Sequence, residues 1–331
     1  MDTWIVGIIF LIIKLLVVLI ALLTVSAYLV WAERKLLGRM QARFGPNRAW
    51  RYGLLQPLAD LIKLITKEDT VPEGASKMIF LLAPGVVAVT ALLIFSVIPF
   101  GKDLTIMGRA MPMVITDLNV GLLFVIALSS LGVYGVALGG WASSSKYSLL
   151  GGIRGAAQMI SYEISLGLSL VPIVMLAGSF SLIDIVNAQN RIPFILIQPI
   201  SFILFFVSAA AEIKRIPFDL PEAENELVAG YHTEYSGMRF GLFFLGEYIT
   251  MIVLGGLVVI FFIGGWHGPI LPPILWFLLK VWVIVFILIW FRGTLPRLRY
   301  DRLMSLGWKV LIPVSLINIM ATGAVILSVK S

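Results

Sequence analysis

The sequence predicts an all-α, polytopic integral membrane protein with about eight transmembrane helices, and three observations indicate this fold class. The 331 residues are 60% hydrophobic and 13% charged, whereas a soluble domain carries roughly 25% charge. Apolar runs of about 20 residues, the length that crosses a bilayer as a helix, recur along the chain. Basic residues lie mainly in alternate connections between these runs. We expect a single transmembrane domain over residues 1–331, with long cytoplasmic loops at about 32–77 and 212–237.

The eight expected spans follow the apolar runs in chain order. They cover about 4–31, 78–99, 117–141, 155–177, 193–211, 238–263, 273–291 and 308–329. Nineteen of the 25 Lys and Arg residues fall in the first, third, fifth and seventh connections or at the adjoining ends of the spans. Because cytoplasmic loops carry the excess of basic residues, we expect these connections in the cytoplasm and both termini on the opposite side.

The first connection is long enough to contain an amphipathic helix. In LLQPLADLIKLITK, starting at Leu54, apolar residues recur on one helical face, and Asp60, Lys63 and Lys67 lie on or near the other. This pattern predicts a cytoplasmic helix that lies at the membrane surface. A weaker pattern of the same kind occurs at 181–188, on the opposite side of the membrane.

The chain has few groups that could hold a redox cofactor. It contains no cysteine, which excludes a thiol-ligated Fe–S cluster, and its two histidines, His232 and His267, lie in connections. We therefore expect no metal site and no cofactor bound by this chain.

Several ionisable residues fall inside the apolar runs or at their ends. A charge costs roughly 2.5–3.5 kcal/mol at the centre of a membrane helix. For Glu163 and Glu247 we favour a proton or ligand path, since burial shifts the pKa of a carboxyl group toward neutrality. Arg154 is nine residues from Glu163, about 13 Å along a helix, and cannot neutralise it there. For Lys14 and Lys280 a buried ion pair or a snorkelling side chain is an equally good explanation.

Five of the chain's 18 acidic residues are concentrated in EIKRIPFDLPEAENELVAG, which begins at Glu212. Pro221 can start a short helix there and Gly230 can end it, and acids in the first helical turn are stabilising. That explanation covers Glu222 and Glu224. It does not cover the other three, and Glu226 would repel Glu222 at i,i+4. We interpret the stretch as a proton-holding cluster, with a solvated acidic loop as the alternative.

Several long motifs resemble the H-subunit family of NADH:quinone oxidoreductase, respiratory complex I, whose mitochondrial counterpart is subunit 1. They are WAERKLLGRMQARFGPNRAWRYGLLQPLADLIKLITKED, SKYSLLGGIRGAAQMISYE, EIKRIPFDLPEAENELVAGYHTEYSG with its sequel MRFGLFFLGEY, and LPRLRYDRLMSLGWK. The resemblance runs from the first span to the last, and within the family the sequence looks bacterial. It implies the bacterial inner membrane, where the orientation expected from the basic residues would put both termini on the periplasmic side.

The resemblance also implies roles for individual residues. Those at or near the quinone chamber would be Glu33, Arg34, Asp60 and Phe244. Those linking the chamber to the charged axis of the membrane arm would be Glu163, Glu212, Asp219, Glu222, Glu224, Glu226 and Glu247. Cytoplasmic counter-charges would be Arg292, Arg297 and Arg299.

The function that the resemblance implies is that of a membrane component of a proton-translocating NADH:quinone oxidoreductase. Quinone would be the substrate, and the Fe–S cluster and the flavin would reside in partner subunits. The partners would be the peripheral quinone-site subunits, the membrane-arm subunits and the lipid bilayer, without nucleic acid. One alternative is the equivalent membrane component of an ion-pumping hydrogenase-type complex. The other is a secondary ion transporter, although such folds usually show internal repeats and none is visible.

Overall fold

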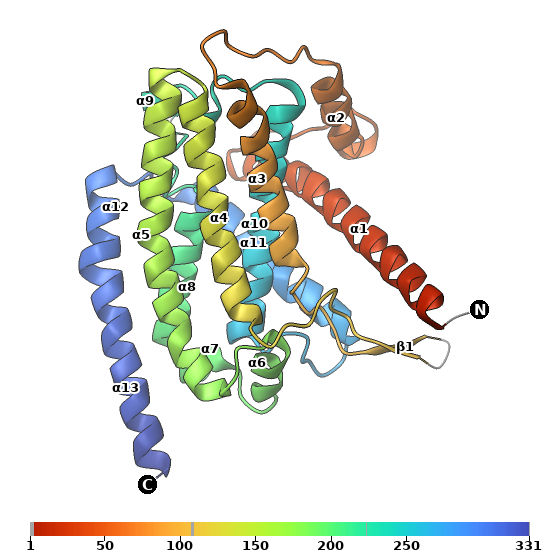
Figure 1. Ribbon diagram of the computed structural model, residues 1–331, viewed down its shortest axis with the longest axis vertical. Helices are drawn as coiled ribbons and strands as arrows, with labels where there is room; N and C mark the ends of the chain where they lie inside the picture. The colour runs from red at the N-terminus through yellow and green to blue at the C-terminus, as the bar shows by residue number, and fades with distance from the viewer. Residues whose placement is uncertain (1–2, 107–108, 223, 331) are drawn as a thin grey trace.

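The computed structural model describes residues 3–106, 109–222 and 224–330, and it is a helical bundle with both ends of the chain in the half away from α2 (Figure 1). Seven helical segments are long and apolar enough to cross a membrane, which confirms the predicted fold class. They are α1 (Thr3–Met40), α3 (Lys77–Phe95), α4 (Gly121–Ala142), α5 (Lys146–Ala177), α10 (Gly237–Phe262), α11 (Pro273–Thr294), and α12 (Tyr300–Leu306) joined through the π-helical turn Gly307–Leu311 to α13 (Ile312–Lys330).

The predicted fifth span is broken in the structure. Residues 193–211 form α7 (Phe194–Ile197) and α8 (Pro199–Glu212), which meet at Gln198. Pro199 stands at the first position of α8, where its missing N–H costs no helical hydrogen bond, so it favours the start of a separate helix at this point. The 14 residues of α8 extend about 21 Å, less than the roughly 30 Å hydrocarbon core.

The helix α10 forms the centre of the bundle. It contacts α1, α3, α8 and α11, and 72% of its apolar window is buried. The helix α5 packs against α4, α8 and α13. By contrast, α1 is almost entirely exposed and leans away from the other helices (Figure 1), so one side of α10 is only partly covered.

The predicted cytoplasmic amphipathic helix is α2 (Gln56–Thr66), which lies near the end of the bundle opposite the termini (Figure 1). Its apolar residues Leu58, Leu61, Ile62 and Ile65 are exposed, as expected for a helix that rests on a membrane surface. The weaker pattern at 181–188 forms α6 (Leu182–Ala188), whose apolar residues are buried. That helix packs against the bundle instead of facing lipid. In the connection between α3 and α4, β1 (Leu104–Ile106) and β2 (Arg109–Met111) pair as two short antiparallel strands.

The acidic stretch does not form the helix expected from Pro221 to Gly230. In this stretch the described residues form α9 (Glu224–Leu227) and the 3₁₀ turn Gly230–His232. Another 3₁₀ turn, Arg51–Gly53, precedes α2 in the first connection. Gly230 has a φ of +61°, and a Cβ there would lie 1.7 Å from the carbonyl oxygen of Pro221. Gly230 therefore folds the chain back onto Pro221, which makes 213–236 a compact loop.

The two lysines within spans cap backbone carbonyl groups and form no ion pair among the described residues. The Lys280 ammonium donates to the carbonyls of Ile263, Gly265 and His267 at 2.8, 3.0 and 2.8 Å. A cation is favourable at this end of α10, where carbonyl groups lack helical partners. Lys14 donates to the carbonyls of Pro112, at 2.8 Å, and Val114.

Candidate functional site

A pocket of about 400 Å³ lies between α1, α2 and α10, and we name it the α1–α2–α10 pocket. This volume is within the range of small-molecule sites. Its wall is mostly apolar, and its charged lining residues are Arg34, Asp60 and Lys63. Arg34, Asp60 and Phe244, three of the four residues implied by the family resemblance to lie at the chamber, therefore line one pocket.

An ion pair attaches α2 to α1 at this pocket. Arg34 Nη1 donates to Asp60 Oδ2 at 2.7 Å, and Gln56 Nε2 donates to Asp60 Oδ1 at 3.0 Å. Asp60 thus holds a polar edge on an otherwise apolar cavity. Phe240, Phe244 and Tyr248 form a row of aromatic rings along α10, with centroids 5.8 and 4.8 Å apart.

Glu33, the fourth implied residue, does not line the pocket. It is 1% exposed and accepts hydrogen bonds from both Arg215 and Arg292. Arg215 Nε also donates to Glu247 Oε1 at 2.8 Å. We call Glu33, Arg215, Glu247 and Arg292 the buried ion network. It joins α1, α10, α11 and the loop 213–236.

The network touches the pocket through Tyr248. The Arg215 guanidinium lies over the Tyr248 ring, 4.3 Å from its centroid, and Tyr248 lines the pocket. Arg215 is buried, which by itself lowers the pKa of a guanidinium, yet Glu247, Tyr248 and Glu33 raise its pKa well above the ordinary value. The guanidinium therefore stays charged between two carboxylates.

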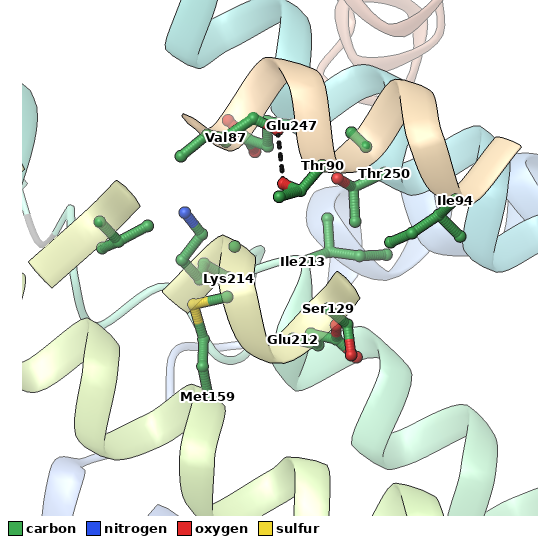
Figure 2. A pocket seen from close by; sticks show the side chains of 13 residues that line it. Val87, Thr90, Ile94, Ser129, Met159, Glu212, Ile213, Lys214, Glu247 and Thr250 are labelled. Atoms are coloured by element: carbon green, nitrogen blue, oxygen red, sulfur yellow. Dashed lines mark hydrogen bonds between the residues drawn. The ribbon is translucent and has the colours of Figure 1, made fainter. Parts of the chain in front are cut away.

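On the other side of the network is a cavity of about 40 Å³, which Figure 2 shows. Its ionisable lining residues are Glu212, Lys214 and Glu247, and its hydroxyl-bearing residues are Thr90, Ser129 and Thr250. A second cavity of about 20 Å³ shares Glu212, Ser129 and Thr250. A water molecule needs roughly 10–15 Å³ of such space and several polar partners. Both cavities can therefore hold water between carboxylates.

Lys214 is the cation at the centre of the acidic loop. It is 6% exposed, and Nζ lies 3.3 Å from the Tyr231 hydroxyl and 4.6 Å from the Tyr231 ring centroid. Burial lowers the pKa of Lys214, and the surrounding carboxylates, Glu247 first, oppose that shift. In Figure 2 its ammonium extends toward Glu247, while Glu212 lies beside Ser129.

Burial shifts the pKa of Glu222 and of His232 in this loop to values that a pH titration can reach. Burial, with the charges of Glu247 and Asp219, raises the pKa of Glu222 to about 8. Burial lowers the pKa of His232 to about 4. Since His232 Nδ1 is 3.9 Å from Glu222 Oε1, the two neutral side chains lie together near pH 7.

The predicted acidic cluster is therefore divided. Asp219 is half-buried and acts electrostatically on Lys214, as do Glu212 and Glu222. The Glu226 side chain is 54% exposed and accepts a hydrogen bond of 2.6 Å from Arg154, which holds its pKa below the usual range. Glu226 is part of the exposed edge of the loop. The Glu224 side chain lies outside the described residues.

Glu163 lies deeper in the bundle than the loop. Its carboxylate accepts a hydrogen bond from Ser130 of α4, and its charge acts on Glu212. The structure thus brings Glu163, Glu212 and Glu247 into one series with the loop carboxylates.

The three expected counter-charges have different positions. Arg292 belongs to the buried ion network. Arg297 lies near enough to Glu226 to lower the pKa of that carboxyl group. Arg299 is exposed and pairs with Asp301 at 3.1 Å.

The sequence does not predict the roles of Lys214, Arg215, Tyr231, His232 and Tyr248. Lys214 and Arg215 contribute there only to the orientation of the chain, although the motif EIKRIP places both directly after an apolar run. That position could have indicated buried cations among the acids. The aromatic residues have no comparable signal, because most aromatic residues in such a chain pack in the core.

Within the part of the chain that the structure describes, no group of three or more His, Cys, Asp or Glu side chains is placed to hold a metal ion. The polar lining of the two small cavities instead consists of the carboxylates Glu212 and Glu247, one cation, Lys214, and hydroxyl groups.

Comparison with known proteins gives a consistent assignment over nearly the whole chain. The chain is 69% identical to the H 2 subunit of NADH-quinone oxidoreductase from Syntrophobacter fumaroxidans, over 99% of each chain. It is 64% identical to the H 1 subunit from Geobacter metallireducens, over 95% of each chain, and 52% identical to the H 2 subunit from Rhizobium meliloti, over 94% of this chain and 96% of that one. The profile of the NADH dehydrogenase family matches residues 13–323. This chain belongs to the NADH dehydrogenase family.

Proposed function

We propose that this chain is the membrane component of a proton-pumping NADH:quinone oxidoreductase that forms the quinone chamber and links it to proton translocation. Family membership supports the assignment to this enzyme. The proposed chamber is the α1–α2–α10 pocket, in which Arg34 and Asp60 would contact the polar ring of the quinone and Phe244 would contact its apolar part.

The observation that carries the proposal is the buried ion network between the pocket and the cavity of about 40 Å³. Glu33 follows the turn of α1 that lines the pocket, and Glu247 lines the cavity next to Lys214 and Glu212. Arg215 contacts both carboxylates. Because charges interact strongly where water is excluded, a change of charge in the pocket would alter the proton affinity of the cavity carboxylates.

The chemistry assigned to this chain is proton supply and response, not electron transfer. Reducing a quinone to a quinol takes up two electrons and two protons. The electrons would come from an Fe–S cluster, and originally from a flavin, in partner subunits. Asp219, Glu222, Glu212 and Glu163 would then pass protons inward from the loop. Glu226 and Glu224 would lie on the exposed side of that path.

The proposed location is the bacterial inner membrane, with both termini in the periplasm. The partners are the peripheral quinone-site subunits, which would cover the loops 41–76 and 213–236, and the membrane-arm subunits. The orientation rests on the distribution of basic residues and agrees with the position of α2 and α9 opposite the termini (Figure 1).

A pair of matched variants tests the chamber. Ala27 lines the α1–α2–α10 pocket, and its neighbour Tyr28 does not. We expect Ala27→Trp to fill the pocket and lower NADH:quinone turnover, while NADH oxidation by a water-soluble artificial acceptor stays unchanged in the assembled complex. Tyr28→Trp should leave both activities unchanged. Normal quinone turnover in assembled Ala27→Trp complexes would show that this pocket is not the quinone chamber.

A further inference from the structure

A second and larger pocket, of about 560 Å³, lies between α1, α10 and α11 in the half of the bundle nearer the termini. Nothing in the proposed function uses it. Its α1 side runs from Phe10 to Val25, and its far side includes Ile252, Phe277 and Val281. Every lining side chain is apolar except Lys14. This pocket is therefore an apolar channel with one cation.

The dimensions of the channel fit a single extended hydrocarbon chain. From Phe10 to Val25 the distance along α1 is about 22 Å, which accommodates the roughly 15 Å of one bilayer leaflet. The lining along this length is almost entirely apolar, as contact with a hydrocarbon chain requires. The length and the lining of the channel therefore match one acyl chain that lies along α1.

The position of Lys14 supplies charge complementarity. The Lys14 ammonium donates to the carbonyls of Pro112 and Val114, in the connection that covers this end of the pocket. An ammonium has three N–H donors, so one remains after these two hydrogen bonds. Asp103 is the acidic residue that acts on this amine, and it is exposed. A phosphate at the membrane interface would accept a charge-assisted hydrogen bond from the remaining donor.

From these observations we infer that the pocket between α1, α10 and α11 binds one phospholipid of the outer leaflet, with its phosphate at Lys14 and one acyl chain along α1. Such a lipid would fill the pocket between α10 and α1, which runs at an angle to the other helices (Figure 1). It would also support the helix whose next turns, from Ser26 onward, line the α1–α2–α10 pocket.

The test uses the assembled complex in nanodiscs that contain a trace of phosphatidylglycerol with a photoreactive acyl chain. A second probe, diacylglycerol with the same photoreactive chain, lacks the phosphate. After irradiation, mass spectrometry maps the labelled residues. We expect phosphatidylglycerol to label residues 10–25 and 274–281, and diacylglycerol to label them severalfold less.

Matched variants separate the headgroup from the channel. Lys14→Gln should reduce phosphatidylglycerol labelling to the level of diacylglycerol, whereas Lys14→Arg should retain it and Lys102→Gln, in the exposed connection, should not change it. Ala21→Phe, which fills the channel, should reduce labelling by both probes. Ile20→Phe, on the outward face of α1, should reduce neither. Lys14→Arg and Ala21→Phe keep the test valid if Lys14→Gln does not assemble.

Three results would overturn the inference. Equal labelling by the two probes that does not change in Lys14→Gln would show that Lys14 does not bind the lipid phosphate. Absence of label from the channel while exposed residues of α1 are labelled would show that another chain fills the space. Displacement of the lipid probe by a long-tailed quinone would assign the channel to the quinone tail. None of these measurements depends on quinone turnover, so they test the lipid site independently of the proposed function.

Discussion

At the scale of single residues, Arg215 connects the pocket to the cavity. Its side chain is 7% exposed and contacts two carboxylates, Glu33 and Glu247. Removal of one partner of a buried ion pair leaves a charge without compensation, which costs roughly 3–5 kcal/mol. We predict that Arg215→Gln lowers stability by about this amount, measured as less assembled complex and a lower midpoint of thermal inactivation.

The exposed pair of Arg299 with Asp301 provides the control for this prediction, since Arg299 is 82% exposed. Arg299→Gln should change stability by about 0–1 kcal/mol. Arg215→Lys should assemble but transfer electrons to quinone more slowly, because an ammonium cannot make the forked contacts of a guanidinium. Arg215→Gln complexes as stable as Arg299→Gln complexes would show that the network is not held by this residue.

Glu222 gives a prediction with a defined pH window. Its pKa is about 8 in the fold and near 4.3 in an unfolded chain, so folding takes up a proton between these two values. Stability should therefore fall as pH rises from about 4.5 to 8, and this part of the loss should be absent in Glu222→Gln. Infrared spectroscopy of the assembled complex should detect a protonated carboxyl component at pH 6.5 that falls to half near pH 8 and is lost at higher pH in the wild type. Glu222→Gln should lack this component.

Glu226 serves as the comparison for Glu222, and here the structure changes the expectation from the sequence. The spacing of four residues places both acids in one cluster. In the structure Glu226 pairs with Arg154 at the exposed edge of the loop. The effects of Glu226→Gln on turnover and on the pH profile should therefore be small, and they should add to those of Glu222→Gln. Strongly non-additive effects in the double variant would show that Glu226 titrates together with Glu222 after all.

At the scale of elements, the ion pair between α1 and α2 closes one side of the proposed chamber. Arg34 is half exposed, so Arg34→Ala or Asp60→Asn should cost only about 0–1 kcal/mol of stability. Each variant should nevertheless lower quinone turnover or raise its KM, with oxidation of NADH by an artificial acceptor retained. Loss of both activities together would indicate that the pair only supports assembly.

The compact loop 213–236 depends on the backbone at Gly230. Alanine there would require a positive φ and would collide with the carbonyl of Pro221. Since no carboxylate is altered, we predict that Gly230→Ala impairs quinone reduction by displacing the loop. Gly167→Ala in α5 has open space around its Cβ and should be neutral or stabilising by up to about 1 kcal/mol. Equal activity of the two variants would contradict the role given to the loop geometry.

Elements also mark the limit of what the sequence predicts. Hydropathy predicts the transmembrane helices and α2, because a bilayer selects on length and polarity. It does not predict the break at Gln198, since both sides of that residue are equally apolar. The family resemblance predicts that Arg34, Asp60 and Phe244 lie together, but it does not predict that Glu33 points away from the pocket. Adjacent residues of a helix, such as Glu33 and Arg34, point in different directions. Only the structure shows that the Glu33 side chain points toward Arg215.

At the scale of the whole molecule, the charge distribution predicts the orientation in the membrane. Nineteen basic residues lie on the side of α2 and the loop 213–236. A reporter enzyme that is active only outside the cytoplasm should therefore be active when fused to the C-terminus, and silent when inserted in the connection 41–50. A silent C-terminal fusion together with an active insertion at 41–50 would show that the topology is the reverse of the predicted one. The acidic loop would then lie on the side of the membrane away from the peripheral subunits.

Coupling across the whole molecule depends on the buried ion network, which connects the proposed chamber to the cavity carboxylates. The most direct test is proton translocation per NADH oxidised, measured in vesicles that contain assembled complexes with Glu247→Gln. This change keeps the size of the side chain and removes the charge that Arg215 and Lys214 face. We predict a severalfold loss of proton translocation, of quinone turnover or of both, while Glu226→Gln remains at the wild-type level. Wild-type turnover and proton yield in Glu247→Gln would contradict this coupling.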